Sequence, residues 1–175
     1  MARRRTCKVC GNKFLPYDTI QQWCSLECGV RLAQKRAEAA KVRSNREERV
    51  KLKTRRTWLS EAQSVFNRYI MERDKDEPCI SCGRYHSGQY HAGHYRTTAA
   101  APELRFSEYN CHKQCAPCNN HKSGNIVDYR IRLKEKIGRD KLAWVEGPHE
   151  PQKWTIDDIK EIKYYFKQRL REIEQ

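Results

Sequence analysis

Residues 79–82 read CISC and residues 115–118 read CAPC, so the second half of the chain carries two C-x-x-C pairs. Such a turn presents two thiolates from one tight knuckle, and zinc favours four thiolates in a tetrahedron. The N-terminal region repeats the pattern with two further cysteine pairs. The sequence therefore predicts two structural zinc ions, one held by Cys7, Cys10, Cys24 and Cys28 and the other by Cys79, Cys82, Cys115 and Cys118.

The cellular compartment decides between zinc ligation and disulfides. The chain begins MARRRTC and lacks the apolar stretch of a secretory signal. It also has no run near the roughly 18 apolar residues of a membrane span. Without export the cysteines should be reduced, and reduced cysteines bind metal rather than form disulfides. A disulfide framework is the alternative interpretation. Cys111 falls outside both sets, and we expect a small buried thiol there, with a ligand role as the alternative.

The charge balance indicates a nucleic-acid partner. Lys and Arg total 36 against 22 Asp and Glu, which gives a net charge of +14. Residues 31–56 contain eleven Lys or Arg, three Glu, and no Gly or Pro. We expect a basic helix that follows phosphates there, and the alternative is a solvated, charged helix or linker. The DNA-contacting cations expected in this stretch are Arg43, Arg46, Lys51, Lys53, Arg55 and Arg56.

Apolar spacing predicts the helices that follow. Only 38% of the 175 residues are apolar, so one core of ordinary size is not expected. Apolar residues recur at three- and four-residue steps over 58–70, 126–137 and 156–173, and a short helix is expected over 140–145. Gly138 should end the second of these helices, and Thr155 with Asp158 should begin the last. The apolar stripe of the last helix predicts either a core face or a seam for a partner helix.

The chemistry-bearing residues lie between the third and fourth cysteine pairs. Residues 91–94 read HAGH, Asn110 follows, and Cys118 is succeeded by Asn119 and Lys122. Phosphodiester hydrolysis needs an activated water, a cation on the phosphoryl oxygens and help for the leaving oxygen. A neutral imidazole can take the proton of the water. A carboxamide oxygen suits Mg²⁺.

This order of motifs resembles the HNH, or ββα-metal, nuclease family. The resemblance implies a zinc-stapled hairpin that carries the general base, His94, and a helix start that carries a metal ligand, Asn119. It also implies that Asn110 orients the base-bearing loop and that Lys122 faces the phosphate. Arg96 and Arg105 flank the base and are expected to grip phosphates as well.

Position 93 departs from that family, which usually has Asp or His immediately before the base. Gly93 stands there, so His91 is the nearest substitute ligand, and a bulge or bend at Gly93 would be needed to face it to the same ion. An imidazole ligand would tilt the preference for the catalytic ion from Mg²⁺ toward Mn²⁺ or another transition ion. Three alternatives stay open: His94 caps a zinc thiolate, His91 is a half-exposed strand residue, and Asn119 is only a helix cap.

A closer resemblance covers nearly the whole chain. Residues 92–102, 104–106 and 112–115, together with residues 118–125, are similar to the NinG/Rap recombination proteins of lambdoid phages, as are Trp23 to Ser25 and Trp154 to Ile156. The resemblance implies a structure-specific endonuclease that cuts Holliday junctions and D-loops with one catalytic Mg²⁺ or Mn²⁺. It also implies a homodimer that nicks paired strands in the host cytoplasm, at the nucleoid, without a membrane.

The expected architecture is therefore a small, zinc-stapled α+β protein. It would comprise an N-terminal zinc ribbon (1–30), a basic helical region for DNA binding and dimerisation (31–75), a ββα-metal core (76–138) and C-terminal helices (139–175). The rival function is a non-catalytic, zinc-stabilised nucleic-acid-binding adaptor. A nuclease without branch preference is a third reading. The net charge and the cysteines are compatible with all three functions. The residues that favour an enzyme are therefore His94, Asn110 and Asn119.

Overall fold

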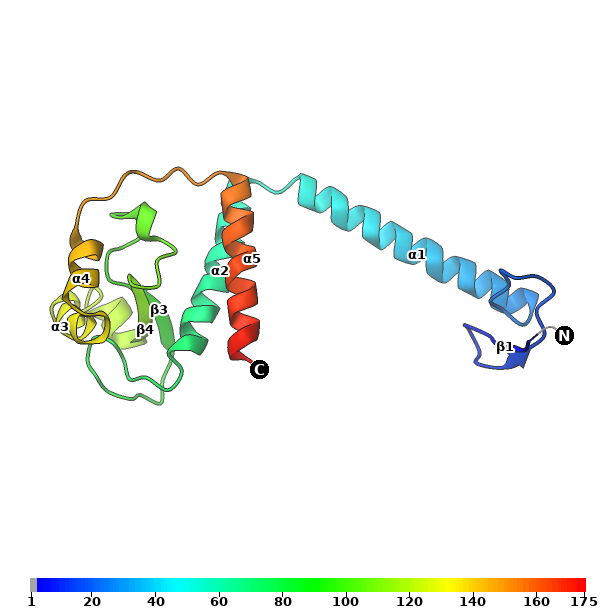
Figure 1. Ribbon diagram of the computed structural model, residues 1–175, viewed down its shortest axis with the longest axis horizontal. Coiled ribbons are helices and arrows are strands. Elements are labelled where there is room, and N and C mark those ends of the chain that lie inside the picture. The colour runs from blue at the N-terminus through cyan, green and yellow to red at the C-terminus, as the bar shows by residue number, and fades with distance from the viewer. Residues whose placement is uncertain (1–2) are drawn as a thin grey trace. The chain divides into compact units, whose positions relative to one another are not determined.

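The computed structural model describes residues 3–175, which form two compact units, residues 3–53 and residues 54–175. The fold is mixed α+β and mostly helical, as predicted (Figure 1). The division falls inside the predicted basic region 31–75, so that stretch is shared between the two units.

A cysteine knuckle and one long helix make up the N-terminal unit. Strands β1 (Arg5–Thr6) and β2 (Lys13–Phe14) pair antiparallel around the first C-x-x-C turn. Helix α1 (Leu26–Lys51) begins where the Ser25 side chain accepts the backbone N–H of Cys28. Leu32 is the buried residue of this helix, so apolar packing contributes little to the N-terminal unit.

The basic helix ends earlier than the sequence indicated. We expected one helical stretch over 31–56, but α1 stops at Lys51, and a second helix, α2 (Arg55–Arg73), begins after a break at residues 52–54. The side chain of Thr54 accepts the backbone N–H of Thr57 and so starts this new helix. A side-chain cap competes locally with continued helix, which residue composition alone does not reveal.

Two helices distant in sequence form the main core of the second unit. Helix α5 (Ile156–Ile173) packs along α2, and the core they share includes Phe66, Ile70, Ile159 and Phe166. The predicted capping box at Thr155 and Asp158 is present. The apolar stripe of α5 is therefore covered by α2 of the same chain, which resolves that prediction in favour of a core face.

A two-stranded hairpin lies next to this helix pair. Strands β3 (Tyr90–His94) and β4 (Cys111–Cys115) pair antiparallel in an unbroken register. Cys111 and Ala92 join the core of α2 and α5, whereas Tyr129 of α3 (Ile126–Ile137) donates a hydrogen bond to the Gly93 carbonyl. The hairpin thus contacts α2 through one face and α3 through the other.

The remaining short elements complete the second unit. A 3-10 turn, η1 (Pro102–Leu104), lies between the two strands, and a π-helical turn, η2 (Pro117–His121), follows β4. Helices α3 and α4 (Arg139–Glu146) enclose a second apolar cluster that includes Leu133 and Val145. Gly138 ends α3 with a φ of 84°, as predicted. No helix within residues 3–175 has the length and apolarity to cross a membrane.

Candidate nucleic-acid and metal sites

The four N-terminal cysteines converge on one point. The Sγ atoms of Cys7, Cys10, Cys24 and Cys28 all lie within 4.8 Å of one another. Two come from the knuckle, Cys24 precedes α1, and Cys28 sits on the first turn of α1. Zn–S bonds of about 2.3 Å place tetrahedral sulfurs roughly 3.8 Å apart, and the Cys24–Cys28 Sγ distance is 3.8 Å.

The second quartet clamps the hairpin. The Sγ atoms of Cys79, Cys82, Cys115 and Cys118 also lie within 4.8 Å of one another, and those of Cys82 and Cys115 are 4.0 Å apart. The set joins the end of β4 and the turn η2 to the segment after α2. His86 was not predicted to take part, yet its Nε2 lies 3.2 Å from the Cys82 Sγ.

Backbone donors favour the thiolate form of one cysteine in each cluster. Hydrogen bonding by the backbone N–H of Cys10, joined by those of Val9 and Cys24, lowers the pKa of Cys7 to about 6. Burial alone would raise the pKa of Cys79, but the backbone N–H groups of Cys115, Cys82 and Ser81 outweigh it and lower that pKa. The pKa values of Cys24, Cys115 and Cys118 are raised instead, first by the neighbouring Cys10 thiol at Cys24 and first by burial at the other two, so zinc binding would release these protons.

His94 is held in one tautomer at the end of β3. Its Nε2 lies 2.9 Å from the carbonyl oxygen of Arg105, so Nε2 must carry the proton and donate it. The lone pair is then on Nδ1, which lies 3.7 Å from the Cys111 Sγ. Burial lowers the pKa of His94, outweighing the bond to the Arg105 carbonyl, with the Arg105 charge acting in the same direction as burial. The imidazole is therefore neutral near pH 7, and its Nδ1 lone pair accepts a weak hydrogen bond from the Cys111 thiol.

Asn110 is fully buried and organises the segment between the strands. Its Oδ1 accepts the backbone N–H of Arg96, while its Nδ2 donates to the carbonyls of Arg96 and Leu104. Those contacts join Arg96, which follows β3, to the turn η1, which precedes Arg105. Because the Arg105 carbonyl fixes His94, Asn110 supports the base-bearing segment through the backbone.

The other expected site residues lie around η2 and on β3. Asn119 is half-buried, and its Nδ2 donates to Asn120; no hydrogen bond joins it to His94 within the described residues. Lys122 is exposed and lines a 380 Å³ pocket with Arg84 and Arg132. Whether these two residues share a site with His94 therefore stays a prediction.

His91 lies on the same face of the hairpin as residue 93, without a bulge in β3. The ladder is regular from Tyr90 to His94, so the expected bend at Gly93 is absent. Side chains alternate along a strand, which puts residues 91 and 93 on one face and His94 on the other. His91 Nε2 is buried and has no hydrogen-bond partner.

The two flanking arginines differ in their surroundings. The guanidinium of Arg96 donates to the carbonyls of Val145 and Gly147, so it fastens the end of α4 and is not held out toward solvent. Arg105 donates to the Gln63 Oε1. It also lines a 520 Å³ pocket with Arg56, Ser60, Gln63 and Asn67, among others.

That cationic pocket includes residues that the sequence did not single out. Gln63 and Asn67 are half-buried on α2, a helix predicted from its apolar residues, and Gln63 donates to Asn67. Burial and the charge of Arg55 lower the pKa of Arg105, which marks a crowded positive site. A helical periodicity of polar residues could have suggested the pair, but nothing in the sequence joined them to Arg105.

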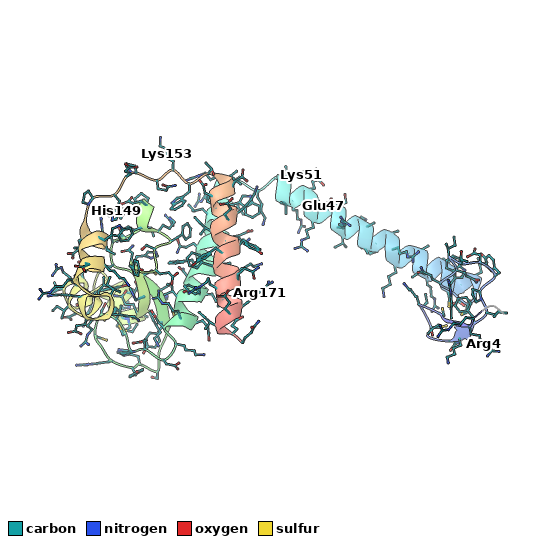
Figure 2. The ribbon with its side chains drawn as sticks, viewed as in Figure 1. Arg4, Glu47, Lys51, His149, Lys153 and Arg171 are labelled. Carbon is teal, nitrogen blue, oxygen red and sulfur yellow. The ribbon has the colours of Figure 1, made fainter. Side chains whose placement is uncertain are left out.

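The predicted DNA-contacting cations lie on both sides of the break after α1. Arg43, Arg46 and Lys51 are exposed on α1, and Figure 2 shows Lys51 near its end. Arg55 donates to the Trp154 carbonyl, and Arg56 lines the cationic pocket. Lys53 lies in the break itself. The N-terminal helix thus presents an exposed basic surface.

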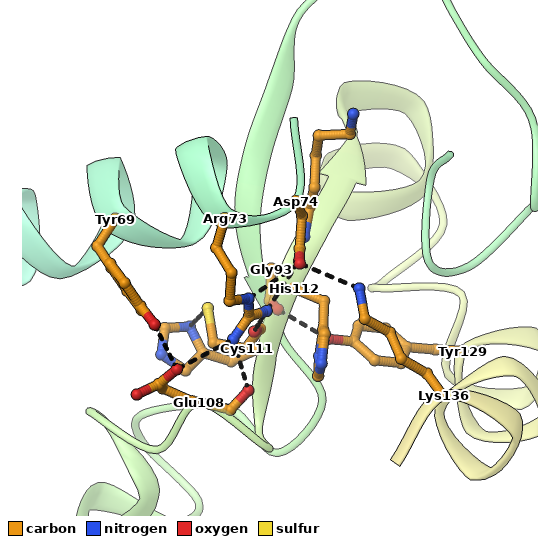
Figure 3. Close-up of polar contacts among 11 residues, drawn as sticks. Tyr69, Arg73, Asp74, Gly93, Glu108, Cys111, His112, Tyr129 and Lys136 are labelled. Carbon is orange, nitrogen blue, oxygen red and sulfur yellow. Dashed lines mark hydrogen bonds and ion pairs between the residues drawn. The ribbon is translucent and has the colours of Figure 1, made fainter. Parts of the chain in front are cut away.

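A buried carboxylate that the sequence did not flag anchors the hairpin. Asp74 accepts hydrogen bonds from Arg73, from Lys136 of α3 and from the backbone N–H of Lys113 in β4 (Figure 3). Burial alone would raise its pKa, but the bonds and charge of Arg73, with the charges of His112 and Lys136, bring it to about 2. Arg73 also donates to the carbonyls of Glu108 and Cys111. This network joins α2, β4 and α3, and Cys111 of β4 pairs with His94 of β3.

Comparison with known proteins places the chain among phage proteins. It matches the family model described as Bacteriophage Lambda NinG protein over residues 1–175. The chain belongs to the NinG family. It is 44% identical over 190 residues to Protein ninG of Escherichia phage lambda, covering 97% of this chain and 93% of that protein. It is also 44% identical over 190 residues to Protein ninG of Salmonella phage P22, covering 97% and 94%. No solved structure matches the chain.

Proposed function

We propose that this NinG-family protein is a metal-dependent endodeoxyribonuclease that cuts branched DNA, including Holliday junctions and D-loops. The observation that carries the proposal is the state of His94: neutral, fixed in one tautomer by the Arg105 carbonyl, and adjacent to a residue that lines a cationic pocket. A positioned neutral imidazole beside phosphate-binding guanidinium groups is what general-base attack on a phosphodiester requires.

Each group has a defined part in the proposed reaction. The Nδ1 atom of His94 exchanges its weak hydrogen bond from the Cys111 thiol for one from water, and takes the proton from that water as it attacks phosphorus. Arg56 and Arg105 bind the phosphate oxygens, and Asn110 keeps the Arg105 segment in place. A divalent ion, when bound, would supply charge stabilisation to the phosphoryl and leaving oxygens. Asn119 remains an expected ligand, whereas His91, the other expected ligand, lies on the face of the hairpin opposite His94 and would hold an ion away from this base.

The preference for branched DNA rests on the resemblance to recombination nucleases. The exposed cations of α1 support it, since an extended basic surface can follow the arms of a junction. A homodimer would bring two sites to one junction. The apolar stripe of α5 cannot serve as the dimer seam, because it is buried against α2 of the same chain. A zinc-stabilised adaptor would use the same basic surface but would have no need for a base held as His94 is.

A junction-cleavage assay tests the proposal. Synthetic four-way junctions and linear duplex are incubated with the protein and Mg²⁺ or Mn²⁺, with and without EDTA. We expect EDTA-sensitive nicks in the junction, loss of nicking in His94→Ala and nearly unchanged junction affinity in that variant. His149→Gln, a histidine on a different part of the unit, serves as the matched control and should cut normally. Wild-type cleavage by His94→Ala refutes the mechanism, and absence of metal-dependent nicks favours the adaptor.

A further inference from the structure

A pocket between α3 and the cysteine turn at residues 79–84, here the α3 pocket, is lined by three cations. Its volume is 380 Å³, and its lining includes Arg84, Lys122 and Arg132. None of these three side chains forms a hydrogen bond or an ion pair with another described residue. Because cations held together without ion-pair partners repel one another, their arrangement favours an anionic ligand.

The frame of the α3 pocket is fixed by its surroundings. A Cβ atom at Gly83 would lie 2.2 Å from the Arg132 Cζ, so the guanidinium group fills the space that this glycine leaves open. The loop that carries Lys122 is anchored too, because the Gly124 carbonyl accepts a hydrogen bond from the buried Gln114 side chain. A ligand would therefore meet a guanidinium group and a loop whose positions are already set.

The charge of the α3 pocket matches that of one phosphodiester. Two carboxylates, Asp128 and Glu135, line it together with the three cations, and Asp128 also accepts a hydrogen bond from Asn125. Three cations and two carboxylates leave one net positive charge, which the single negative charge of a phosphodiester neutralises. Guanidinium groups present paired N–H donors that fit phosphate oxygens. The pocket therefore suits one phosphate of a nucleic-acid strand.

The α3 pocket and the cationic pocket lie on opposite sides of the hairpin. Side chains alternate along a strand and paired residues share a face, so Gln114 and His94 lie on opposite faces. Gln114 donates to Ser81, which lines the α3 pocket, whereas the Arg105 carbonyl that fixes His94 belongs to a residue of the cationic pocket. Figure 1 shows the corresponding helices, α3 and α2, on either side of the two strands.

One linear duplex cannot supply phosphates to both pockets. Along one strand, phosphates recur about every 3.4 Å of helix axis, and a straight strand runs past only one side of the hairpin. Across the duplex, the major groove is about 12 Å wide and admits one helix or one two-stranded ribbon. A hairpin with α2 on one side and α3 on the other is wider than that groove. Two arms that diverge from a branch meet neither limit.

We propose that the α3 pocket binds a phosphate of a second DNA strand, which places the hairpin and its two flanking helices between two arms of a branched DNA. The inference rests on the proposed function, in which Arg56 and Arg105 bind the phosphate that is attacked. Lys122 then contacts the second strand and not the phosphate beside His94. The second contact forms only on branched DNA, so it supplies a preference for that substrate over linear duplex.

Replacing Arg84 and Arg132 by Gln tests the α3 pocket. Fluorescence anisotropy compares the zinc-loaded full chain and this variant on a four-way junction protected by phosphorothioate linkages and on a linear duplex. Because one phosphate contact is lost, the junction affinity should fall about fivefold at physiological salt, and the slope of log affinity against log salt should become shallower by about 1. The duplex affinity should change by less than about twofold, since a duplex does not reach this pocket.

Lys134 and Arg139 provide the matched control. Both are exposed cations outside the α3 pocket, and their replacement by Gln removes the same charge. This control should bind junction and duplex as wild type does. If Arg132→Gln fails to fold, Arg84→Gln alone decides, and its loss should again be confined to the junction. Wild-type junction affinity in the pocket variant, equal losses on junction and duplex, or the same loss in the control overturns the proposal.

These measurements separate the α3 pocket from the proposed function. If the pocket variant loses affinity for the junction alone but the wild-type protein nicks no junction, the second-strand site stands and the nuclease proposal fails. If the wild-type protein nicks the junction while the pocket variant binds it with unchanged affinity, the nuclease proposal stands and this inference is overturned.

Discussion

Single residues set the local shape of the hairpin that carries His94. Gly93 leaves room for Gln114 from the opposite strand, and Tyr129 donates to the Gly93 carbonyl (Figure 3). His112, paired with Gly93, is buried, and its Nδ1 lies 3.2 Å from the Tyr129 hydroxyl oxygen. Small changes at these positions therefore have consequences for the whole hairpin.

Gly93→Ala should destabilise the protein by about 1–3 kcal/mol. The added Cβ would meet the Oε1 of Gln114, and this side chain cannot swing away without breaking its bonds to Ser81 and Gly124. Gly88→Ala is the matched control, because nothing lies within 4 Å of a Cβ there, and it should stay within about 0.5 kcal/mol of wild type. Urea unfolding gives both values, and equal stability of the two variants would contradict the packing described.

His112 should make stability depend on pH in mild acid. Burial lowers its pKa to about 3, whereas an unfolded histidine titrates near 6.5. As pH falls below about 6.5 the unfolded chain binds a proton that the folded chain refuses, so stability decreases. Between pH 7.5 and 5.5 the loss from this residue should be about 1.4 kcal/mol.

Urea unfolding at the two pH values, with zinc in excess, measures this loss. His112→Gln should show a smaller decrease than wild type, because its side chain takes up no proton. The exposed His121→Gln should retain the full decrease. An unchanged decrease in His112→Gln would show that the acid sensitivity arises elsewhere.

At the scale of elements, zinc clusters and helix packing hold different parts of the chain. The second unit has an apolar core between α2 and α5 and another beneath α3 and α4. In the N-terminal unit, the residues described as buried are Cys7, Gln21 and Leu32. A unit with so little buried apolar surface depends on its metal cluster.

Cys10→Ser should unfold the N-terminal knuckle and leave the second unit intact. Loss of one thiolate opens the zinc cluster, and no apolar core remains to hold β1, β2 and the start of α1. In ¹H–¹⁵N spectra, signals of residues 3–25 should collapse while those of α2 and α5 keep their positions. Cys111→Ala, a cysteine outside both quartets, should leave residues 3–25 unchanged. A folded knuckle in Cys10→Ser would mean that zinc is dispensable there.

At the scale of the whole molecule, the charge is spread unevenly. The net charge is +14, and the 31–56 stretch alone carries eleven of the 36 Lys and Arg residues. Along α1 these side chains are exposed, with isolated pairs such as Arg43 with Glu47. Surface ion pairs of this kind hold little energy, so the cations remain available to phosphates.

The salt dependence of DNA binding should report this surface. Replacing Arg43 and Arg46 by Gln should make the negative slope of log affinity against log salt shallower by about 2. With each phosphate contact that is lost, DNA binding releases roughly one counterion fewer. The matched control replaces Lys167 and Arg171, two exposed cations of α5, and should leave the slope unchanged. Fluorescence anisotropy with a junction from 50 to 300 mM salt, roughly the range over which such slopes are linear, measures both. If the slope becomes shallower in the α5 variant but not in the α1 variant, α1 is not the DNA-binding arm.

The sequence by itself determined the cysteine quartets, the helices over 58–70, 126–137 and 156–173, and the capping box at Thr155. Each depends on spacing within a short stretch, and thiolate pairs, apolar periodicity and caps act over a few residues. The break before α2 was missed because a single side-chain cap at Thr54 decided it.

Only the tertiary structure decided what surrounds the predicted chemistry. The carbonyl of Arg105 fixes the tautomer of His94, Gln63 from α2 meets Arg105, Arg96 turns inward to α4, and Gln114 fills the space at Gly93. These contacts join residues far apart in the chain, and hydrogen bonds of this kind depend on ångström-level distances. Spacing along a chain carries no such distances, so they arise only when the core and the zinc clusters bring the elements together.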